Sequence, residues 1–375
     1  MIEQIHYLTQ KNQMKKLLTL LLIVCFQSTQ AQSLKRYLYV AEPGIRNYLE
    51  YGGHGILVYD IDKNFALVKR IPTGSLDSTG HPSNVKGVCV SLATQCIYVS
   101  TVKSLMCINL KTEKLVWEKT YPKGCDRMAI SNDGLTIFQP SFENDMWYVI
   151  DARTGDLKEQ ITPKSKAHNT IVGLNGKEVY LEGLASPMLT VINPLKISEQ
   201  RIVGPFTNSI RPFTINGKQT LVYANVNELL GFEIGDLKSG KMIHRVEVKG
   251  FKKGSIKRHG CPSHGIGLTP DEKELWVSDG ANQMMHVFDN TQMPPVQKTS
   301  IALRDQPGWI TFSLDGKYAF PSTGEVIDVA TKKIIKSLSD EKGGIVQSEK
   351  VVEIHFKDSK VITKGDQFGL GRVLK

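Results

Sequence analysis

Seven stretches of this chain repeat one pattern: a short apolar strand, a tight turn and a second apolar strand. They begin at Gly87, Met128, Thr170, Phe213, Gly265, Trp309 and Val351. Successive starts lie 41, 42, 43, 52, 44 and 42 residues apart, and most pairs are followed by a third strand that ends near Asp or Asn and then by a fourth. A period in the low forties with four strands per unit is typical of a β-propeller blade.

The turns between paired strands support this interpretation. Several contain Asp-Gly or Asn-Gly, residues that tolerate the positive φ of a two-residue hairpin. These turns lie at 133–134, 175–176, 216–217 and 315–316. No helical period of useful length interrupts the pattern, so a helical solenoid is excluded.

The two ends of the chain complete one blade between them. RYLYVAE, GILVYDID and ALVKRIPT near the N-terminus match second, third and fourth strands without a first, and VVEIHF from Val351 supplies the missing strand. Such sharing closes a ring and leaves no sheet edge exposed. We therefore predict an all-β, seven-bladed β-propeller as one domain over residues 32–375. Eight blades is the alternative if the tail from Lys360 forms its own sheet.

Second strands of the IYVST type, followed by third strands that end in Asp, resemble those of the YVTN-type repeat propellers. That superfamily includes lactonase-like and nitrite-reductase-like propellers. The resemblance covers nearly all of the chain after its leader and implies the propeller architecture. Because the superfamily hosts enzymes, electron-transfer partners and binding proteins, the resemblance does not select an activity.

The N-terminus has the features of a secretory signal peptide. From Met14 the chain reads MKKLLTLLLIVCFQSTQAQS, with two lysines, an apolar run and small residues at a cleavage spacing. We predict that residues 1–31 are removed, that Met14 is the true start and that the protein is extracytoplasmic, either periplasmic or secreted. A membrane anchor is the alternative, although the apolar run is about half of the roughly 20 residues that span a bilayer. No later segment is apolar enough to span, and we expect a monomer.

Charge and cysteine content exclude some classes of function. Removing residues 1–31 lowers the formal charge from +10 to about +8, since three lysines and one glutamate are lost. The remaining lysines are scattered through turns, which is typical of a solvated surface, so nucleic-acid binding is not expected. Five cysteines remain, without CxxC or CxxCH. No cofactor is predicted from these patterns, no metal ligands are assigned, and a divalent metal stays possible.

Loops before first strands and loops joining second to third strands share one face of a propeller. We call the stretches before the first strands the mouth segments; they are 80–86, 123–127, 166–169, 208–212, 258–264, 305–309 and 347–350. First strands surround the central channel, so side chains at these mouths are expected to point toward the axis. Six of the seven blades place a cation or an imidazole there, whereas the opposite face carries routine turns.

The candidate site follows from this clustering. Converging Arg and Lys focus a positive potential, and Arg grips a carboxylate through two parallel hydrogen bonds. Predicted ligand-binding residues are Arg46, His54, His81, Lys86, Arg127, Asn169, Arg211, Asn225, Arg258, His259, Trp309, Glu349 and Lys350. Imidazoles supply a general base near neutral pH or bind transition metals. Simple pairing of the charges and packing of Trp309 between blades are the structural alternatives.

The leading hypothesis is an exported propeller that binds a small anionic polar ligand such as an acidic sugar, with catalysis on that ligand left open. Arg127 and Arg211 would hold the anion, His168 or His264 would act as base, and Tyr48 or Tyr51, in a lid-like loop, as acid. Lyase or hydrolase chemistry would fit such a set of groups. The alternative is a module without catalysis that docks a partner protein or a redox enzyme.

Overall fold

The computed structural model describes residues 34–255 and 258–374, together with Met1, Ile2, Gln4, His6, Tyr7 and Gln13. The chain divides into a short unit, Met1–Lys35, and a large one, Arg36–Lys375. The predicted start at Met14 and the apolar run of the signal peptide lie outside the described residues. Within the described part, no helix has the length and apolar character that crossing a membrane requires.

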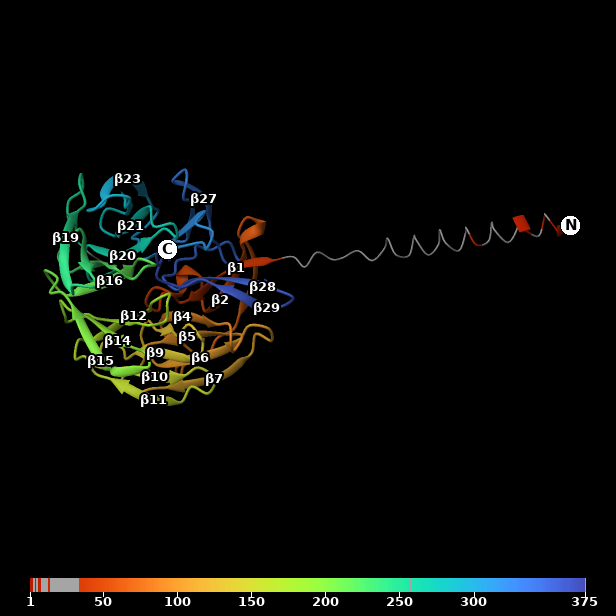
Figure 1. Ribbon diagram of the computed structural model, residues 1–375, viewed down its shortest axis with the longest axis horizontal. Coiled ribbons are helices and arrows are strands. Elements are labelled where there is room, and N and C mark those ends of the chain that lie inside the picture. The colour runs from red at the N-terminus through yellow and green to blue at the C-terminus, as the bar shows by residue number, and fades with distance from the viewer. Residues whose placement is uncertain (3, 5, 8–12, 14–33, 256–257, 375) are drawn as a thin grey trace. The chain divides into compact units, whose positions relative to one another are not determined.

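Seven antiparallel sheets form a ring (Figure 1), which confirms the predicted seven-bladed β-propeller. Blade 1 has the order β29-β28-β1-β2-β3, and the other blades each have four strands. Blade 1 comprises β1 (Lys35–Glu42), β2 (Gly55–Asp60), β3 (Ala66–Ile71), β28 (Val351–Lys357) and β29 (Lys360–Lys364). Two 3-10 helices, η1 (Leu49–Tyr51) and η2 (Ile61–Lys63), follow β1 and β2.

The other six blades follow in chain order. Blade 2 comprises β4 (Val85–Ser91), β5 (Cys96–Thr101), β6 (Ser104–Asn109) and β7 (Leu115–Thr120), and blade 3 comprises β8 (Ala129–Ile130), β9 (Thr136–Pro140), β10 (Trp147–Asp151) and β11 (Leu157–Ile161). Blade 4 comprises β12 (Ala167–Val172), β13 (Val179–Gly183), β14 (Leu189–Asn193) and β15 (Lys196–Val203). Blade 5 comprises β16 (Ile210–Ile215), β17 (Leu221–Val226), β18 (Gly231–Asp236) and β19 (Lys241–Glu247). Blade 6 comprises β20 (Ser263–Leu268), β21 (Glu274–Asp279), β22 (Met284–Asp289) and β23 (Val296–Ala302), and blade 7 comprises β24 (Ile310–Phe312), β25 (Tyr318–Pro321), β26 (Glu325–Asp328) and β27 (Lys333–Ser337).

The Asp or Asn that ends each third strand has one structural role throughout the ring. Its side-chain oxygen accepts hydrogen bonds from backbone N–H groups two or three residues further on, as in Asp60, Asn109 and Asp328. Such side chains replace a backbone acceptor and stabilise the turn into the fourth strand. This explains why the repeat is visible in the sequence.

The ends of the chain meet in blade 1 as predicted. β28 lies beside β1, and the N–H of Ala41 donates to the carbonyl of Lys350 at 3.0 Å. The tail from Lys360 does not form an eighth blade, because β29 adds a fifth strand to this same sheet. The eight-bladed alternative is therefore wrong.

After β29 the chain runs along the inner strands toward the middle of the ring, where the C-terminus lies in Figure 1. The side chain of Gln367 accepts from the N–H of Val88 at 3.0 Å and donates to the carbonyl of Met128 at 2.9 Å. The carbonyl of Gly369 accepts from the N–H of Leu268 and from the hydroxyl of Thr214, both at 2.9 Å. The tail thus ties together the first strands of blades 2, 3, 5 and 6.

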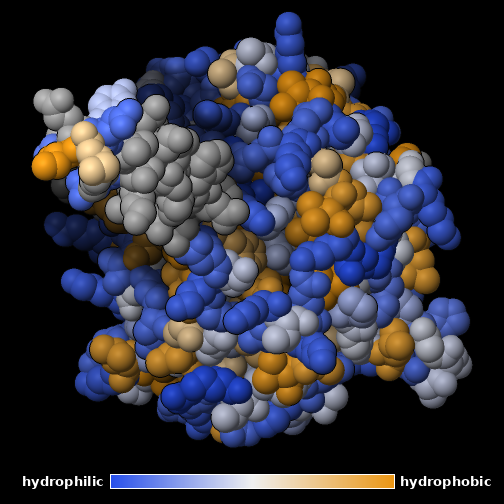
Figure 2. Space-filling model, turned by 90° about the vertical axis from the view of Figure 1, so that its right-hand side faces the viewer, coloured by the Kyte–Doolittle hydropathy of each residue, from blue (hydrophilic) through white to orange (hydrophobic). Residues whose placement is uncertain are grey.

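Packing between neighbouring blades forms the hydrophobic core. One cluster joins Val58 of blade 1 to Val88 and Ile97 of blade 2, and another joins Phe232 of blade 5 to Ile266 of blade 6. The outer strands carry scattered exposed apolar side chains, such as Val116 and Ile335. Figure 2 shows the side near blade 1, where hydrophobic residues form small groups separated by hydrophilic ones.

Gln367→Ala is expected to lower the free energy of unfolding by about 2–4 kcal/mol. The change leaves the N–H of Val88 and the carbonyl of Met128 buried without partners, and each unsatisfied buried group costs about 1–3 kcal/mol. Urea unfolding followed by tryptophan fluorescence measures the effect. Gln160→Ala, at an exposed residue of β11, is the control and should stay near the wild-type value; equal stabilities of the two variants would contradict the role of the tail.

Candidate functional site

Side chains from six of the seven blades meet around the axis on the mouth side of the ring. We call this group the axial cluster; its members are Lys86, Asp126, Arg127, His168, Asn169, Glu182, Arg211, His259, His264, Glu349 and Lys350. Most of them come from mouth segments, at the start of a first strand or just before it. The structure therefore brings together predicted residues that are up to 264 positions apart (350 − 86).

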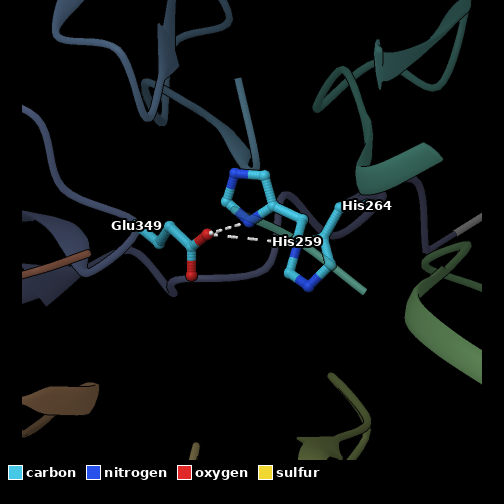
Figure 3. A group of neighbouring side chains, drawn as sticks. All are labelled: His259, His264 and Glu349. Atoms are coloured by element: carbon cyan, nitrogen blue, oxygen red, sulfur yellow. Dashed lines mark ion pairs between the residues drawn. The ribbon is translucent and has the colours of Figure 1, made fainter. Parts of the chain in front are cut away.

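Glu349 lies at the centre of the cluster. One of its oxygens, Oε2, accepts from Arg127 Nη2 at 2.9 Å and from Lys350 Nζ at 2.8 Å. Its other oxygen, Oε1, faces two imidazoles, at 3.3 Å from His259 Nδ1 and 4.0 Å from His264 Nδ1 (Figure 3). Burial raises the pKa of Glu349, but the charges around it, led by Lys350, outweigh burial and hold the pKa well below its usual range. The carboxylate is therefore ionised.

Burial acts in the opposite sense on the bases around Glu349. It lowers the pKa of Lys350 to about 7, although the neighbouring carboxylate of Glu349 opposes the shift. Burial also lowers the pKa of His259 and holds that of His264 well below its usual range, with the charge of His259 adding to the effect on His264. Both histidines are therefore neutral near pH 7.

Glycines allow this close approach. A Cβ on Gly308 would lie 2.1 Å from His259 Cε1 and 2.5 Å from Glu349 Oε1, and a Cβ on Gly260 would lie 2.0 Å from Arg211 Nη2. Any side chain at either position would displace these groups.

A second carboxylate, Asp126, orients a histidine of the cluster. Asp126 Oδ2 lies 2.8 Å from His168 Nδ1, and Oδ1 lies 3.3 Å from Lys86 Nζ. Burial lowers the pKa of His168 more than Asp126 raises it, so Nδ1–H of a neutral ring donates to the carboxylate. His168 Nε2 makes no hydrogen bond within the described protein, which leaves its lone pair available to accept a proton. The arrangement suits a general base.

Arg211 differs from the other cations of the cluster because none of the described carboxylates lies within ion-pair distance of it. Its Nε is buried and lacks a hydrogen-bond partner among the described residues. Arg211 acts electrostatically on Glu182, which is buried beside Asn169 and accepts from Asn169 Nδ2 at 2.7 Å. Burial raises the pKa of Glu182 to about 8, so this carboxyl is largely protonated near pH 7 and does not neutralise Arg211.

The cluster holds further buried polar atoms without partners in the described protein. They are Arg127 Nη1, Asn169 Oδ1, Glu182 Oε1 and His259 Nε2, with Asn225 Oδ1 beside them. Buried polar atoms are nearly always satisfied by protein, water or ligand. Their concentration here indicates a place where water or a polar ligand completes the hydrogen bonding.

Trp309 forms the base of the cluster. The guanidinium of Arg127 lies 3.4 Å from the centroid of its ring, and its indole N–H donates to the carbonyl of Gln367 in the tail. With 3% of its surface exposed, Trp309 packs between Arg127 and Phe368. The environment of Trp309 therefore matches the alternative in which this side chain packs between blades. It leaves the indole little surface for stacking on a ligand.

The mouth segment of blade 6 (258–264) contacts both blade 7 and blade 1. Arg258 forms an ion pair with Asp305 at 2.8 Å and donates to Gln347 at 2.9 Å and to the Tyr51 hydroxyl at 2.6 Å. From the other side, Arg46 donates to the carbonyl of Arg258 at 3.1 Å. Residues 258–262, just before β20, thus form a bridge from blade 6 to blades 7 and 1 beside the axial cluster.

The other predicted residues occupy different places. Tyr48 packs edge to face with Tyr51, and Tyr51 engages Arg258 rather than the cluster. Asn225 donates to the carbonyl of His264 and braces it. His54 contacts Thr73, and His81 lies exposed in a turn beside Thr79, so neither is brought to the axial cluster by the contacts of the described residues.

Asp126 and Glu182 were not among the predicted site residues. Glu182 had a usable signal, since it stands near the end of a second strand where other blades place Ser, Asn or Gln. None of the five described cysteines is paired. Burial raises the pKa of Cys261 to about 11, so its thiol stays protonated and is a poor nucleophile.

His259, His264 and Glu349 each offer one ligand atom within 4.8 Å of the others, so they could hold a metal ion. The axial cluster as a whole can bind an anion at Arg211 and Lys86 and can accept a proton at His168. These capabilities involve different side chains.

No protein-family model matches the chain, and no curated protein matches it. Solved structures similar to it include dihydro-heme d1 dehydrogenase NirN in complex with DHE, with 14% identity, 88% of this chain and 73% of that chain covered and a TM-score of 0.61. Hydrazine synthase of Kuenenia stuttgartiensis has 12% identity, 75% and 88% coverage and a TM-score of 0.58. The Cps50 (Swd1) β-propeller domain of Myceliophteria thermophila has 10% identity, 68% and 86% coverage and a TM-score of 0.55. At these identities the similarity shows the propeller fold alone.

Glu349→Gln is expected to lower the free energy of unfolding by about 3–5 kcal/mol, because it leaves the charge of Arg127 buried without a counterion and weakens the hydrogen bonding of Lys350. Urea unfolding at pH 7.5 measures it. Glu341→Gln is the matched control, since it removes the exposed partner of Arg70 and should cost less than about 1 kcal/mol. Similar losses in the two variants would show that Glu349 is not the central partner.

Stability is expected to fall as pH drops below about 6.5, the ordinary pKa of histidine. The pKa of His168, His259 and His264 is lowered in the folded protein, so below that pH the unfolded chain binds more protons. Each histidine contributes up to about 2 kcal/mol between pH 6.5 and 5.0. Urea unfolding across this range should show a shallower loss for His264→Gln and an unchanged loss for His81→Gln; parallel curves for all three proteins would refute the assignment to His264.

Proposed function

We propose that the axial cluster binds a small anionic polar ligand such as an acidic sugar or a related carboxylate. The observation that carries the proposal is Arg211, a half-buried cation without an ion-pair partner among the described residues and with an unsatisfied buried Nε. A guanidinium placed in this way offers paired donors to a carboxylate.

The balance of charge supports an anion. Lys86, Arg127, Arg211 and Lys350 face the carboxyl groups of Asp126, Glu182 and Glu349. Because Glu182 has a pKa of about 8 and is largely protonated near pH 7, it contributes a donor as well as an acceptor. The cluster is therefore positive on balance, and the low-dielectric walls of the propeller strengthen its attraction for an anion.

The groups that retain some exposure are those that a ligand would meet. The side chains of Lys86, His168 and His264 are 13%, 11% and 10% exposed, whereas Arg127 and Lys350 are each 4% exposed. Arg127 would thus organise the site from below, and Arg211 with Lys86 would contact the anion. Hydroxyl groups of a sugar would satisfy Asn169 Oδ1 and Glu182 Oε1.

Proton transfer is the chemistry that this arrangement favours. His168, held by Asp126, would remove a proton from a carbon beside a carboxylate whose charge Arg211 neutralises. Elimination would follow as the bond between the β-carbon and its oxygen substituent breaks and the leaving oxygen takes a proton from water, and hydrolysis would use the same base to activate water. We also propose that the protein is exported through the predicted signal peptide and that it is a member of the YVTN-type superfamily. Both proposals rest on the sequence.

The similarity to NirN, solved in complex with DHE, favours a haem-type compound as a second candidate ligand for the same mouth. Docking of a partner protein has less support, because the described mouth residues are mainly charged or polar rather than an extended apolar surface.

Arg211→Gln is expected to weaken uronate binding by about 10- to 100-fold, which corresponds to the loss of a charge-assisted hydrogen bond of about 1.5–3 kcal/mol. Isothermal titration calorimetry of the protein with glucuronate and galacturonate, and with galactose as the neutral analogue, measures it. Arg245→Gln is the control, since it changes an exposed arginine on the outer strand of the same blade.

Three outcomes would overturn the proposal. They are the absence of uronate binding, equal binding of galactose, and equal affinities of Arg211→Gln and the wild type. Titration of the same proteins with haem distinguishes the two candidate ligands. Binding of haem without binding of uronates would favour the haem-type compound over the acidic sugar.

A further inference from the structure

We propose that His259, His264 and Glu349 form a binding site for one divalent transition-metal ion. The three residues come from the bridge before β20, from β20 itself and from the mouth segment before β28. Their ligand atoms lie within 4.8 Å of one another. This goes beyond anion binding at Arg211, because it concerns a cation and different side chains.

The spacing fits direct coordination. Zinc–ligand distances of about 2.0–2.1 Å in tetrahedral geometry place neighbouring ligand atoms about 3.3 Å apart. Glu349 Oε1 lies 3.3 Å from His259 Nδ1 and 4.0 Å from His264 Nδ1. The three ligand atoms lie within 4.8 Å of one another, so the imidazoles would close by up to about 1.5 Å to reach the spacing of this coordination.

Glu349 Oε1 is available as a ligand. It accepts no hydrogen bond from the described residues, whereas Oε2 accepts from both Arg127 and Lys350. Carboxylates that bind metals are commonly held in this way, with outer groups fixing the oxygen that does not coordinate. Figure 3 shows the free oxygen turned toward both imidazoles.

Coordination through His264 Nδ1 requires a change of tautomer and a turn of the ring away from the Gly308 carbonyl. His264 Nδ1 lies 2.7 Å from the carbonyl of Gly308 and donates to it while it carries the proton. Coordination through Nδ1 moves that proton to Nε2, so the ring stays neutral and no proton leaves the protein. The rings of His259 and His264 are 4.7 Å apart at their centroids, so both can turn toward one ion.

The ligand set and the surrounding charge select the class of ion. Two imidazoles and one carboxylate suit Zn²⁺, Co²⁺, Ni²⁺ or Fe²⁺, whereas Mg²⁺ and Ca²⁺ prefer sites built from oxygen. Arg127 and Lys350 repel any cation, which weakens the site and excludes ions that do not bind imidazole strongly. The structure therefore fits a transition ion that binds through nitrogen.

Binding of Zn²⁺ and Co²⁺ to the full chain, purified without a polyhistidine tag and treated with chelator, tests the site. Titration calorimetry is expected to give one equivalent per chain, and bound Co²⁺ should show the intense visible absorption of a site with low coordination number. His259→Ala and His264→Ala are each expected to weaken binding at least about 10-fold. His355→Gln removes a histidine that pairs with Glu353 elsewhere and should bind as the wild type does.

The Tm of the same proteins, measured with and without Zn²⁺, provides a second test that does not depend on calorimetry. Zn²⁺ should raise the Tm of the wild type and of His355→Gln, since an ion that binds only the folded state stabilises it. It should not raise the Tm of His259→Ala. Less than one equivalent bound to the wild type, or unchanged affinity in both alanine variants, would overturn the site, whether or not either variant unfolds more easily. Arg211→Gln should bind the ion normally, so failure of the metal site and failure of the anion site can be distinguished.

Discussion

The carboxylate of Glu349 is the group on which the rest of the axial cluster depends. It is ionised and almost fully buried, and burying a charge without partners costs far more than one ordinary interaction returns. Arg127 from blade 3 and Lys350 from blade 1 supply its hydrogen bonds, and His259 approaches from the mouth of blade 6. One side chain therefore joins three blades that are not all neighbours in the ring.

The bridge before β20 follows from this constraint. Blade 7 separates blade 6 from blade 1, just as blade 2 separates Arg127 of blade 3 from Glu349. The interval of 52 residues before Gly265 contains the bridge, and Arg258 anchors it to Asp305 of blade 7 and to Gln347 and Tyr51 of blade 1. The long interval, which looked like an irregularity of the repeat, positions His259 at Glu349.

The repeat made the architecture predictable, because hairpin turns and the Asp or Asn after each third strand recur at a fixed spacing. It also placed the mouth segments on one face, which is how Lys86, Arg127 and His264 could be expected to converge. The partners of these side chains could not be predicted, since they depend on contacts across the ring. Position on a face does not determine distance from the axis. For that reason the predicted site omitted Asp126 and Glu182 and included His54 and His81.

The path of the tail could not be predicted either, because DQFGLGRV has no strand pattern. Its course nevertheless decides what the channel can do. The tail and Trp309 occupy the side below Arg127, where Gln367 and Gly369 satisfy backbone groups of the inner strands. Several polar groups that remain unsatisfied, Arg211 Nε and His259 Nε2 among them, lie in the mouth-side cluster above Trp309. A channel that served only to close the ring would be better sealed with apolar residues on both sides, since a partly satisfied buried polar network is less stable than an apolar core. The partly satisfied network retained at the mouth therefore supports the ligand site proposed above.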